Sequence, residues 1–144
     1  MKPLGLRSVT KSVALLCIFF CAIANAEVSV IDDSGRRVTL SSPAKRIVSL
    51  APHATELLFV AGAGNKVIGV SSGSDYPSEA SQLPSTGNSS RLDIERITLL
   101  KPDLIIAWTS GNNPRQIAQL RQQGYAVLES EPRRFEDIAT TLER

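Results

Sequence analysis

The sequence predicts an α/β fold in which a mainly parallel sheet is covered by helices on both faces and is preceded by a β-hairpin. From Arg46 onwards, short apolar runs alternate with stretches of helical periodicity, as expected for parallel strands joined by helical crossovers. The run Leu104–Trp108 is apolar at every position, which is typical of a strand buried on both faces.

Residues 1–26 are expected to be a secretory signal peptide rather than part of this fold. Three basic residues precede an uncharged apolar run over residues 13–24, and Ala24 and Ala26 then fit the small-residue positions of a cleavage site. The run is shorter than the roughly 20 residues that a membrane-spanning helix needs, so an uncleaved anchor is the less favoured alternative. Both cysteines, Cys17 and Cys21, lie in this segment, so no disulfide is expected beyond it.

Charge and motifs exclude several classes of function. Three of the 16 basic residues belong to the signal segment, so the rest of the chain is close to neutral. It has no Lys/Arg cluster interleaved with aromatic residues, which argues against nucleic-acid binding. The sequence also lacks G-x-S-x-G, P-loop and G-x-G-x-x-G motifs. We therefore predict no catalytic residues and no enzymatic activity.

The first elements follow from local patterns. Val28–Ile31 and Arg37–Leu40 alternate apolar and polar residues around a turn-rich tetrad, which predicts a β-hairpin within a lead-in over residues 27–45. Residues 47–50 predict the next strand, followed by a helix over 54–61, which the glycines just beyond it end.

The remaining elements repeat this alternation. Val67–Val70 predicts a strand, and a weak signal at residues 85–86 favours a short one. Further strands are expected over Leu104–Trp108 and 126–129, and helices over 92–100, 114–123 and 135–142. Pro102 breaks the first of these helices, and Pro114 suits the first turn of the second.

The loops at the carboxyl edge of the sheet are the expected binding region, because ligands of parallel α/β sheets bind outside the carboxyl ends of the strands. These loops span residues 51–55, 71–77, 87–91, 109–113 and 130–134. Trp108 ends its strand at this edge, and the sequence leaves open whether it packs in the core or forms an apolar wall for a ligand.

A metal site is not expected. His53 and Glu56 could face the same way on one helical turn, but zinc takes three or four protein ligands. Only Asp75 and Asp93 are further candidates near the loop face, and Asp93 suits a helix cap. In the helix over 92–100, Leu92, Ile97 and Leu99 are expected to face the core, so on residue type alone Glu95 is a solvated acid.

Several motifs in a fixed order carry a family resemblance. They are R-I-V-S-L-A-P-H-A-T-E-L-L-F from Arg46, S-D-Y-P from Ser74, L-D-I-E-R-I from Leu92, K-P-D-L-I-I-A-W from Lys101, G-N at Gly111 and R-Q-I-A-Q-L from Arg115. This series resembles the iron–siderophore, haem and vitamin B12 class of periplasmic solute-binding proteins. Within the class, S-D-Y-P and A-W-x-x-G-N are most similar to the cobalamin-binding members.

The resemblance implies two α/β lobes joined by a long helix, with the ligand between them. We expect residues 46–144 to form the amino-terminal lobe of such a protein, as a truncated form. It implies no catalysis and no cofactor: the protein would capture cobalamin or a related corrinoid in the periplasm and deliver it to an ABC permease in the inner membrane. Haem or a ferric siderophore is the alternative ligand. The alternatives of another class are a lobe without ligand binding and a small exported flavodoxin-like protein.

The resemblance and the loop positions together give the candidate site residues. The expected ligand-binding residues are Pro52, His53, Gly73, Tyr76, Ser89, Arg91 and Trp108. By its position in L-D-I-E-R-I, Glu95 matches the exposed glutamate that docks against arginines of the permease. Gly73 and residues 88–90 stand where cobalamin-binding relatives carry aromatic residues, so fewer rings would stack on a corrin here.

Overall fold

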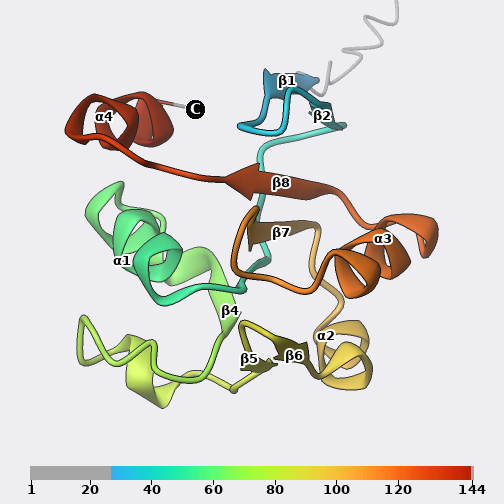
Figure 1. Cartoon of the computed structure of the whole chain (residues 1–144). Coiled ribbons are helices and arrows are strands. Elements are labelled where there is room, and N and C mark those ends of the chain that lie inside the picture. Colours follow the sequence, from blue (N-terminus) through green and yellow to red (C-terminus); the bar gives the residue numbers. More distant parts are fainter. Residues whose placement is uncertain (1–26, 144) are drawn as a thin grey trace, which may run out of the picture.

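The computed structural model of the chain describes residues 27–143 (Figure 1). The expected signal peptide lies outside the described residues. The first elements, β1 (Val28–Ile31) and β2 (Arg37–Leu40), pair antiparallel with Val28 opposite Leu40, as the alternating pattern predicts.

A four-stranded parallel sheet forms the centre of the fold. Its strand order is β4 (Val67–Val70), β3 (Ile47–Ser49), β7 (Leu104–Trp108) and β8 (Val127–Ser130). The two central strands, β3 and β7, are covered on both faces, which explains why every position of β7 is apolar.

Helices cover both faces of this sheet, so the predicted α/β class is confirmed (Figure 1). One face carries α2 (Ile94–Leu100) and α3 (Pro114–Gln122), and the other carries α1 (Pro52–Val60) and α4 (Phe135–Glu143). The core on the α2–α3 side consists of Val48, Leu50, Leu92, Ile97, Ile105, Ala107, Ile117, Leu120 and Val127. The smaller core on the α1 side consists of Ile47, Ala51, Ala54 and Ile106.

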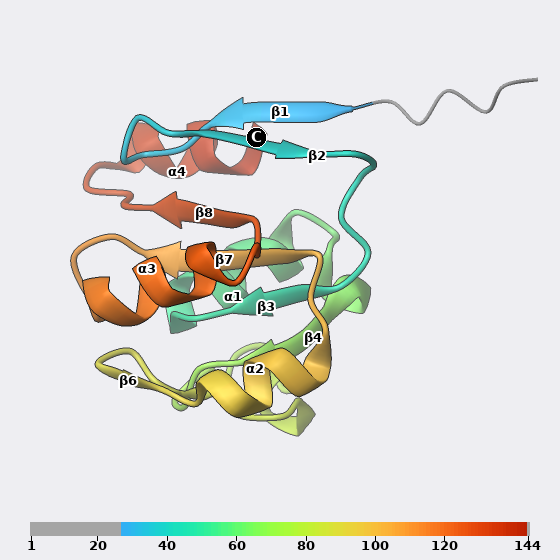
Figure 2. The same cartoon turned by 90° about the vertical axis from the view of Figure 1, so that its right-hand side faces the viewer.

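The hairpin lies along the edge strand β8 (Figure 2). The backbone N–H of Asp33 donates to the carbonyl of Glu129 at 3.0 Å, and the N–H of Glu129 donates to the carboxylate of Asp32 at 3.2 Å. The N–H of Glu131 donates to the carboxylate of Asp33 at 2.7 Å. These contacts pair polar groups of a strand edge that would otherwise be open to other chains.

A small ribbon between β4 and α2 departs from the prediction. β5 (Gly87–Asn88) and β6 (Arg91–Leu92) pair antiparallel, so α2 begins only at Ile94, with Asp93 as its cap. The weakly predicted strand at residues 85–86 is reduced to one parallel bridge between Val70 and Ser85.

Two further details complete the fold. Short 3-10 helices, η1 (Gly64–Lys66) and η2 (Ala80–Gln82), lie on either side of β4 in the sequence. The prediction that Leu99 faces the core is wrong, because its side chain is 80% exposed while Ile97 fills the core position of α2. Between residues 27 and 143, no helix has the length and apolar character needed to cross a membrane.

Candidate functional site

The carboxyl ends of the four parallel strands meet at one edge of the sheet. Three of the predicted site residues, Pro52, His53 and Trp108, lie at this edge. β3 runs directly into α1, whose first residues are Pro52 and His53. Proline suits this position because its missing N–H has no partner in the first turn of a helix. β7 ends at Trp108, which therefore lies at the same edge.

His53 and Trp108 are in contact at this edge. Their ring centroids are 5.3 Å apart and their planes meet at 82°, an edge-to-face arrangement. Both side chains are half-buried, and His53 Nε2 is buried without a hydrogen-bond partner among residues 27–143. Burial lowers the pKa of His53 and outweighs the opposing effect of Glu131 and Glu56. His53 is therefore neutral at pH 7.

Asn112 joins three segments of this edge. Its side-chain Nδ2 donates to the carbonyl of Leu50 at 3.1 Å and to the carbonyl of Ser89 at 3.0 Å. Its Oδ1 accepts the backbone N–H of Trp108 at 2.7 Å. Asn112 is 4% exposed, so these bonds are shielded from water. The amide thereby connects the end of β3, the β5–β6 ribbon and the end of β7.

A buried cluster of hydroxyl groups fixes the loop after β4. Thr55 Oγ1 lies 2.9 Å from Ser49 Oγ and 3.1 Å from both Ser74 Oγ and the carbonyl of Ala51. Ser71 Oγ lies 3.1 Å from Ser74 Oγ and extends the cluster into the loop. Because these groups are buried, each depends on the others for its hydrogen bonds. The cluster holds the 71–77 loop against the start of α1.

The other predicted ligand-binding residues make no hydrogen bond, ion pair or ring contact with the His53–Trp108 pair within residues 27–143. Gly73 is exposed in the 71–77 loop, with a φ of +86° that a larger residue rarely adopts. Tyr76 is 66% exposed and lines an open groove of about 450 Å³ with Phe59. Ser89 contributes its carbonyl to Asn112, whereas the side chain of Arg91 is exposed.

The predicted ligand-binding residues therefore fall into two groups, one connected by contacts and one not. The structure brings together His53 and Trp108 directly, and Ser89 through Asn112. Within the described part of the chain, no hydrogen bond, ion pair or ring contact joins Tyr76 or the side chain of Arg91 to that group. Sequence reasoning assigned no role to Asn112, although its G-N pair is one of the motifs.

Glu95 is exposed in the first turn of α2, where the helix dipole favours an acid. Its neighbour Arg96 is engaged, because it lies 3.7 Å from the carboxylate of Asp93 and donates to the carbonyl of Ser85 at 3.0 Å. Glu95 itself makes no ion pair with any other residue between 27 and 143. Leu99 lies one turn further along α2 and is exposed beside it.

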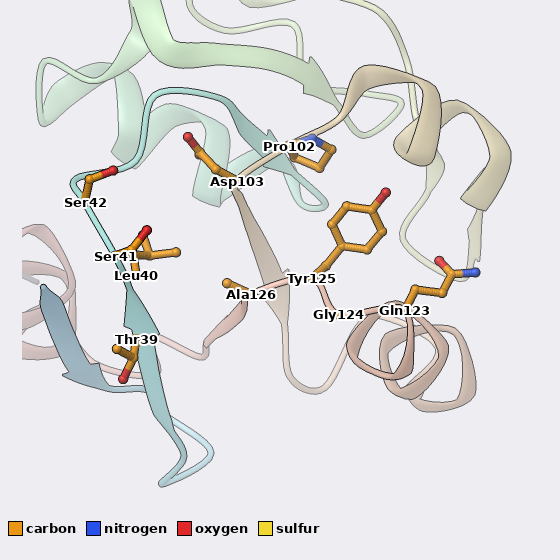
Figure 3. A pocket seen from close by; sticks show the side chains of 10 residues that line it. All are labelled: Thr39, Leu40, Ser41, Ser42, Pro102, Asp103, Gln123, Gly124, Tyr125 and Ala126. Atoms are coloured by element: carbon orange, nitrogen blue, oxygen red, sulfur yellow. The ribbon is translucent and has the colours of Figure 1, made fainter. Parts of the chain in front are cut away.

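A separate cavity of about 470 Å³ lies at the opposite, amino edge of the sheet (Figure 3). Its lining comes from the end of β2 and from the segments just before β7 and β8. Asp103 in this lining accepts the backbone N–H groups of Lys45 at 2.8 Å and Arg46 at 3.0 Å. That carboxylate fixes the connection into β3. Among residues 27–143 there is no group of three or more side chains suited to hold a metal ion.

Comparison with known proteins decides the family. A profile of the periplasmic binding protein family matches residues 47–144. The chain belongs to this family. The match confirms the predicted membership in the periplasmic solute-binding proteins. This family consists of binding proteins rather than enzymes.

Among curated members of the periplasmic binding protein family, the vitamin B12-binding protein of Vibrio cholerae is 50% identical over 101 residues, which cover 70% of this chain and 37% of the relative. The vitamin B12-binding protein of Yersinia pestis is 35% identical over 144 residues, which cover 100% of this chain and 46% of the relative. The chain thus spans less than half the length of these relatives, and this partial coverage fits the amino-terminal lobe of the family fold.

Solved structures of periplasmic binding proteins resemble this chain in fold and sequence. The crystal structure of the periplasmic vitamin B12 binding protein BtuF of Vibrio cholerae has a TM-score of 0.66 and 50% identity, over 68% of this chain and 38% of that one. The periplasmic heme-binding protein RhuT from Roseiflexus sp. RS-1 has a TM-score of 0.56 and 37% identity, over 59% and 33% of the two chains.

Proposed function

We propose that this chain is the amino-terminal binding lobe of an ABC-importer solute-binding protein, and that the transported ligand is cobalamin or a related corrinoid. The 50% identity to a vitamin B12-binding protein is the observation that carries this proposal. It is supported by Trp108, which stands half-buried at the edge where α/β proteins bind ligands.

The edge offers a surface suited to a large, flat ligand. The indole of Trp108 can bury ligand area by stacking. Neutral His53 beside it adds surface that carries no charge, so ligand binding does not have to remove water from a charged group. The loops at the same edge would supply the remaining contacts, from Pro52, Gly73, Tyr76, Ser89 and Arg91. In this role cobalamin is cargo, held and released unchanged.

Haem is the second candidate, because RhuT is 37% identical to this chain. Haem iron commonly takes an axial histidine, and His53 is the only histidine of the chain. Its Nε2 is buried against Trp108 rather than presented at the surface. This placement argues against a haem ligated by His53.

Fluorescence of Trp108, the only tryptophan, tests the ligand. We would titrate the full chain, and a fusion of it to the remaining part of the Vibrio cholerae relative, with cyanocobalamin and with hemin, correcting for ligand absorbance. Saturable quenching by cyanocobalamin is expected, with tighter binding by the fusion because more of the ligand is buried. Saturation by hemin alone would shift the proposal to haem. Saturation by neither ligand in either protein would remove it.

We further propose that Glu95 docks against basic residues of the permease. The carboxylate is exposed and makes no ion pair between residues 27 and 143, and charges at an interface rim set orientation more than affinity. Glu95→Lys in the fusion should reduce cobalamin uptake by cells while leaving cobalamin affinity unchanged. The matched control is Glu79→Lys, at another exposed glutamate in the loop before η2. Uptake by Glu95→Lys equal to that of the control would remove this role.

The proposed location is the periplasm, after cleavage of residues 1–26. The exported protein should then begin at Glu27, followed by the lead-in over residues 27–45. N-terminal sequencing of the protein recovered from a periplasmic fraction tests this. An intact Met1 would contradict cleavage.

A further inference from the structure

The turn after β7 places Gly111 directly beneath the ring of Trp108. A Cβ atom built at Gly111 would overlap Cε3, Cδ2 and Cζ3 of that ring, far inside the 3.0 Å that real Cβ atoms keep. The φ of Gly111 lies outside the left-handed region, so the backbone itself does not require glycine. The requirement comes from the Trp108 ring, which supplies the three nearest atoms.

Asn112 makes two hydrogen bonds to the backbone of Trp108 across the same turn. Its backbone N–H donates to the carbonyl of Trp108 at 2.9 Å, while its Oδ1 accepts the N–H of Trp108 at 2.7 Å. Its Nδ2 uses both hydrogens, one on the carbonyl of Leu50 and one on that of Ser89. An aspartate of the same shape would face these two carbonyls with an oxygen and lose both bonds.

The outer part of the turn is held separately. The backbone N–H of Ser110 donates to one carboxylate oxygen of Glu131 at 3.0 Å, and its hydroxyl donates to the other at 2.9 Å. The turn is thus tied to the loop after β8 without help from Gly111 or Asn112. Changes at those two positions should therefore affect the ring and the three segments more than the path of the turn.

We infer that Gly111 and Asn112 are positioning residues of the ligand edge. Gly111 sets where the Trp108 ring lies, and Asn112 holds the segments that carry His53, Ser89 and Trp108 in one preformed arrangement. A preformed edge has less conformational freedom to lose on binding, which raises affinity without any new contact to the ligand. The choice of cobalamin as ligand rests on the proposed function, whereas the positioning of the Trp108 ring and the three segments does not.

The variants Gly111→Ala and Asn112→Asp of the full chain test the inference. The controls are Gln122→Ala, at an exposed side chain in the last turn of α3, and Asn65→Asp, at an exposed amide in η1. Emission of Trp108 and its quenching by acrylamide are measured first without ligand, and circular dichroism checks the fold. Asn112→Ser, which removes the amide without adding charge, is the second variant should Asn112→Asp not fold.

Gly111→Ala should shift the emission and quenching of Trp108 with the circular dichroism retained, because the methyl group displaces the ring. Asn112→Asp should increase quenching. Both variants should bind cyanocobalamin at least about tenfold more weakly, because a single unmade buried hydrogen bond or lost contact is already equivalent to about that factor. Both controls should behave like the parent chain.

Unchanged emission and quenching in folded Gly111→Ala would overturn the positioning role, whatever the ligand. Shifted emission, together with no binding of cyanocobalamin by either the parent chain or its fusion to the remaining part of the Vibrio cholerae relative, would uphold the positioning role and reject the ligand instead. The two failures are therefore distinguishable.

Discussion

Asp32 fastens the hairpin to the edge strand β8, and its replacement by asparagine should destabilise the fold. The side chain of Asp32 is fully buried. Its Oδ1 accepts the N–H of Ser34 at 3.0 Å and of Arg36 at 2.8 Å, and its Oδ2 accepts the N–H of Glu129 at 3.2 Å. Arg121 Nη2 lies 3.9 Å away.

Asparagine keeps the shape but has one acceptor oxygen. Whichever way the amide of Asp32→Asn lies, its NH₂ group faces a backbone N–H, and at least one buried donor loses its partner. An unmade buried hydrogen bond costs about 1–3 kcal/mol, and lost attraction to Arg121 adds to it, so we expect a loss of about 2–4 kcal/mol at pH 7.

The loss should depend on pH. Burial alone would raise the pKa of Asp32, but hydrogen bonds from Ser34, Arg36 and Glu129 outweigh it, so the pKa lies below its ordinary value of 3.8. A carboxyl with a depressed pKa stabilises the fold above its unfolded pKa, and this stability is lost as the pH falls through the folded pKa. The gap between the two proteins should therefore shrink below about pH 4.

Urea unfolding followed by circular dichroism, at pH 7 and at steps down to pH 3, measures this gap. Asp75→Asn, at an exposed aspartate in the 71–77 loop, is the matched control and should unfold like the parent. Equal stability of Asp32→Asn and the parent at pH 7, or a gap that persists unchanged in acid, would refute the reasoning.

Three other variants test the core and the ligand edge. Thr55→Val should cost about 1–3 kcal/mol and make the 71–77 loop more sensitive to protease, because buried Ser49 and Ser74 lose a partner; parent-like stability and cleavage would contradict this. Leu50→Ala should cost about 2–5 kcal/mol in urea unfolding, since Leu50 is fully buried; a loss below about 1 kcal/mol would contradict the packing. Folding lowers the pKa of His53 below 6.5, so the unfolded chain binds this proton more tightly and stability should fall as the pH drops below about 6.5. His53→Phe should lack that decline in unfolding midpoints between pH 7 and 5, and an identical decline in both proteins would exclude His53 as its source.

Elements with a local signature were predictable from the sequence. The predicted bounds of β1, β2, β4 and β7 match the structure, because alternation or an unbroken apolar run marks each strand. α1 begins two residues before the predicted start, at Pro52. Helical periodicity does not mark a first turn, since its side chains need not face the core.

The β5–β6 ribbon was not predictable, because two-residue strands carry no periodicity. It depends on Gly87 with a φ of +91° and on Asn88, whose Oδ1 accepts the N–H groups of Ser90 and Arg91. Leu99 was misplaced for a related reason. α2 has apolar residues on two sides, and only tertiary packing decides that Ile97 is buried while Leu99 is not.

The candidate site was predictable only in outline. Placing Pro52, His53 and Trp108 at one edge follows from strand order, because parallel strands end on the same side. The role of Asn112 does not follow, since its side chain binds carbonyls of Leu50 and Ser89, which are far apart in the sequence. The contact of Gly111 with the Trp108 ring is likewise a product of the folded turn.

Calorimetric titration with cyanocobalamin tests the central claim most directly, using the fusion to the remaining part of the Vibrio cholerae relative and its Trp108→Ala variant. We expect saturable binding by the parent fusion and binding at least about tenfold weaker by Trp108→Ala, because a stacked aromatic face and its buried area are lost. No binding by the parent, or equal binding by both proteins, would contradict the proposal that this edge holds a corrinoid.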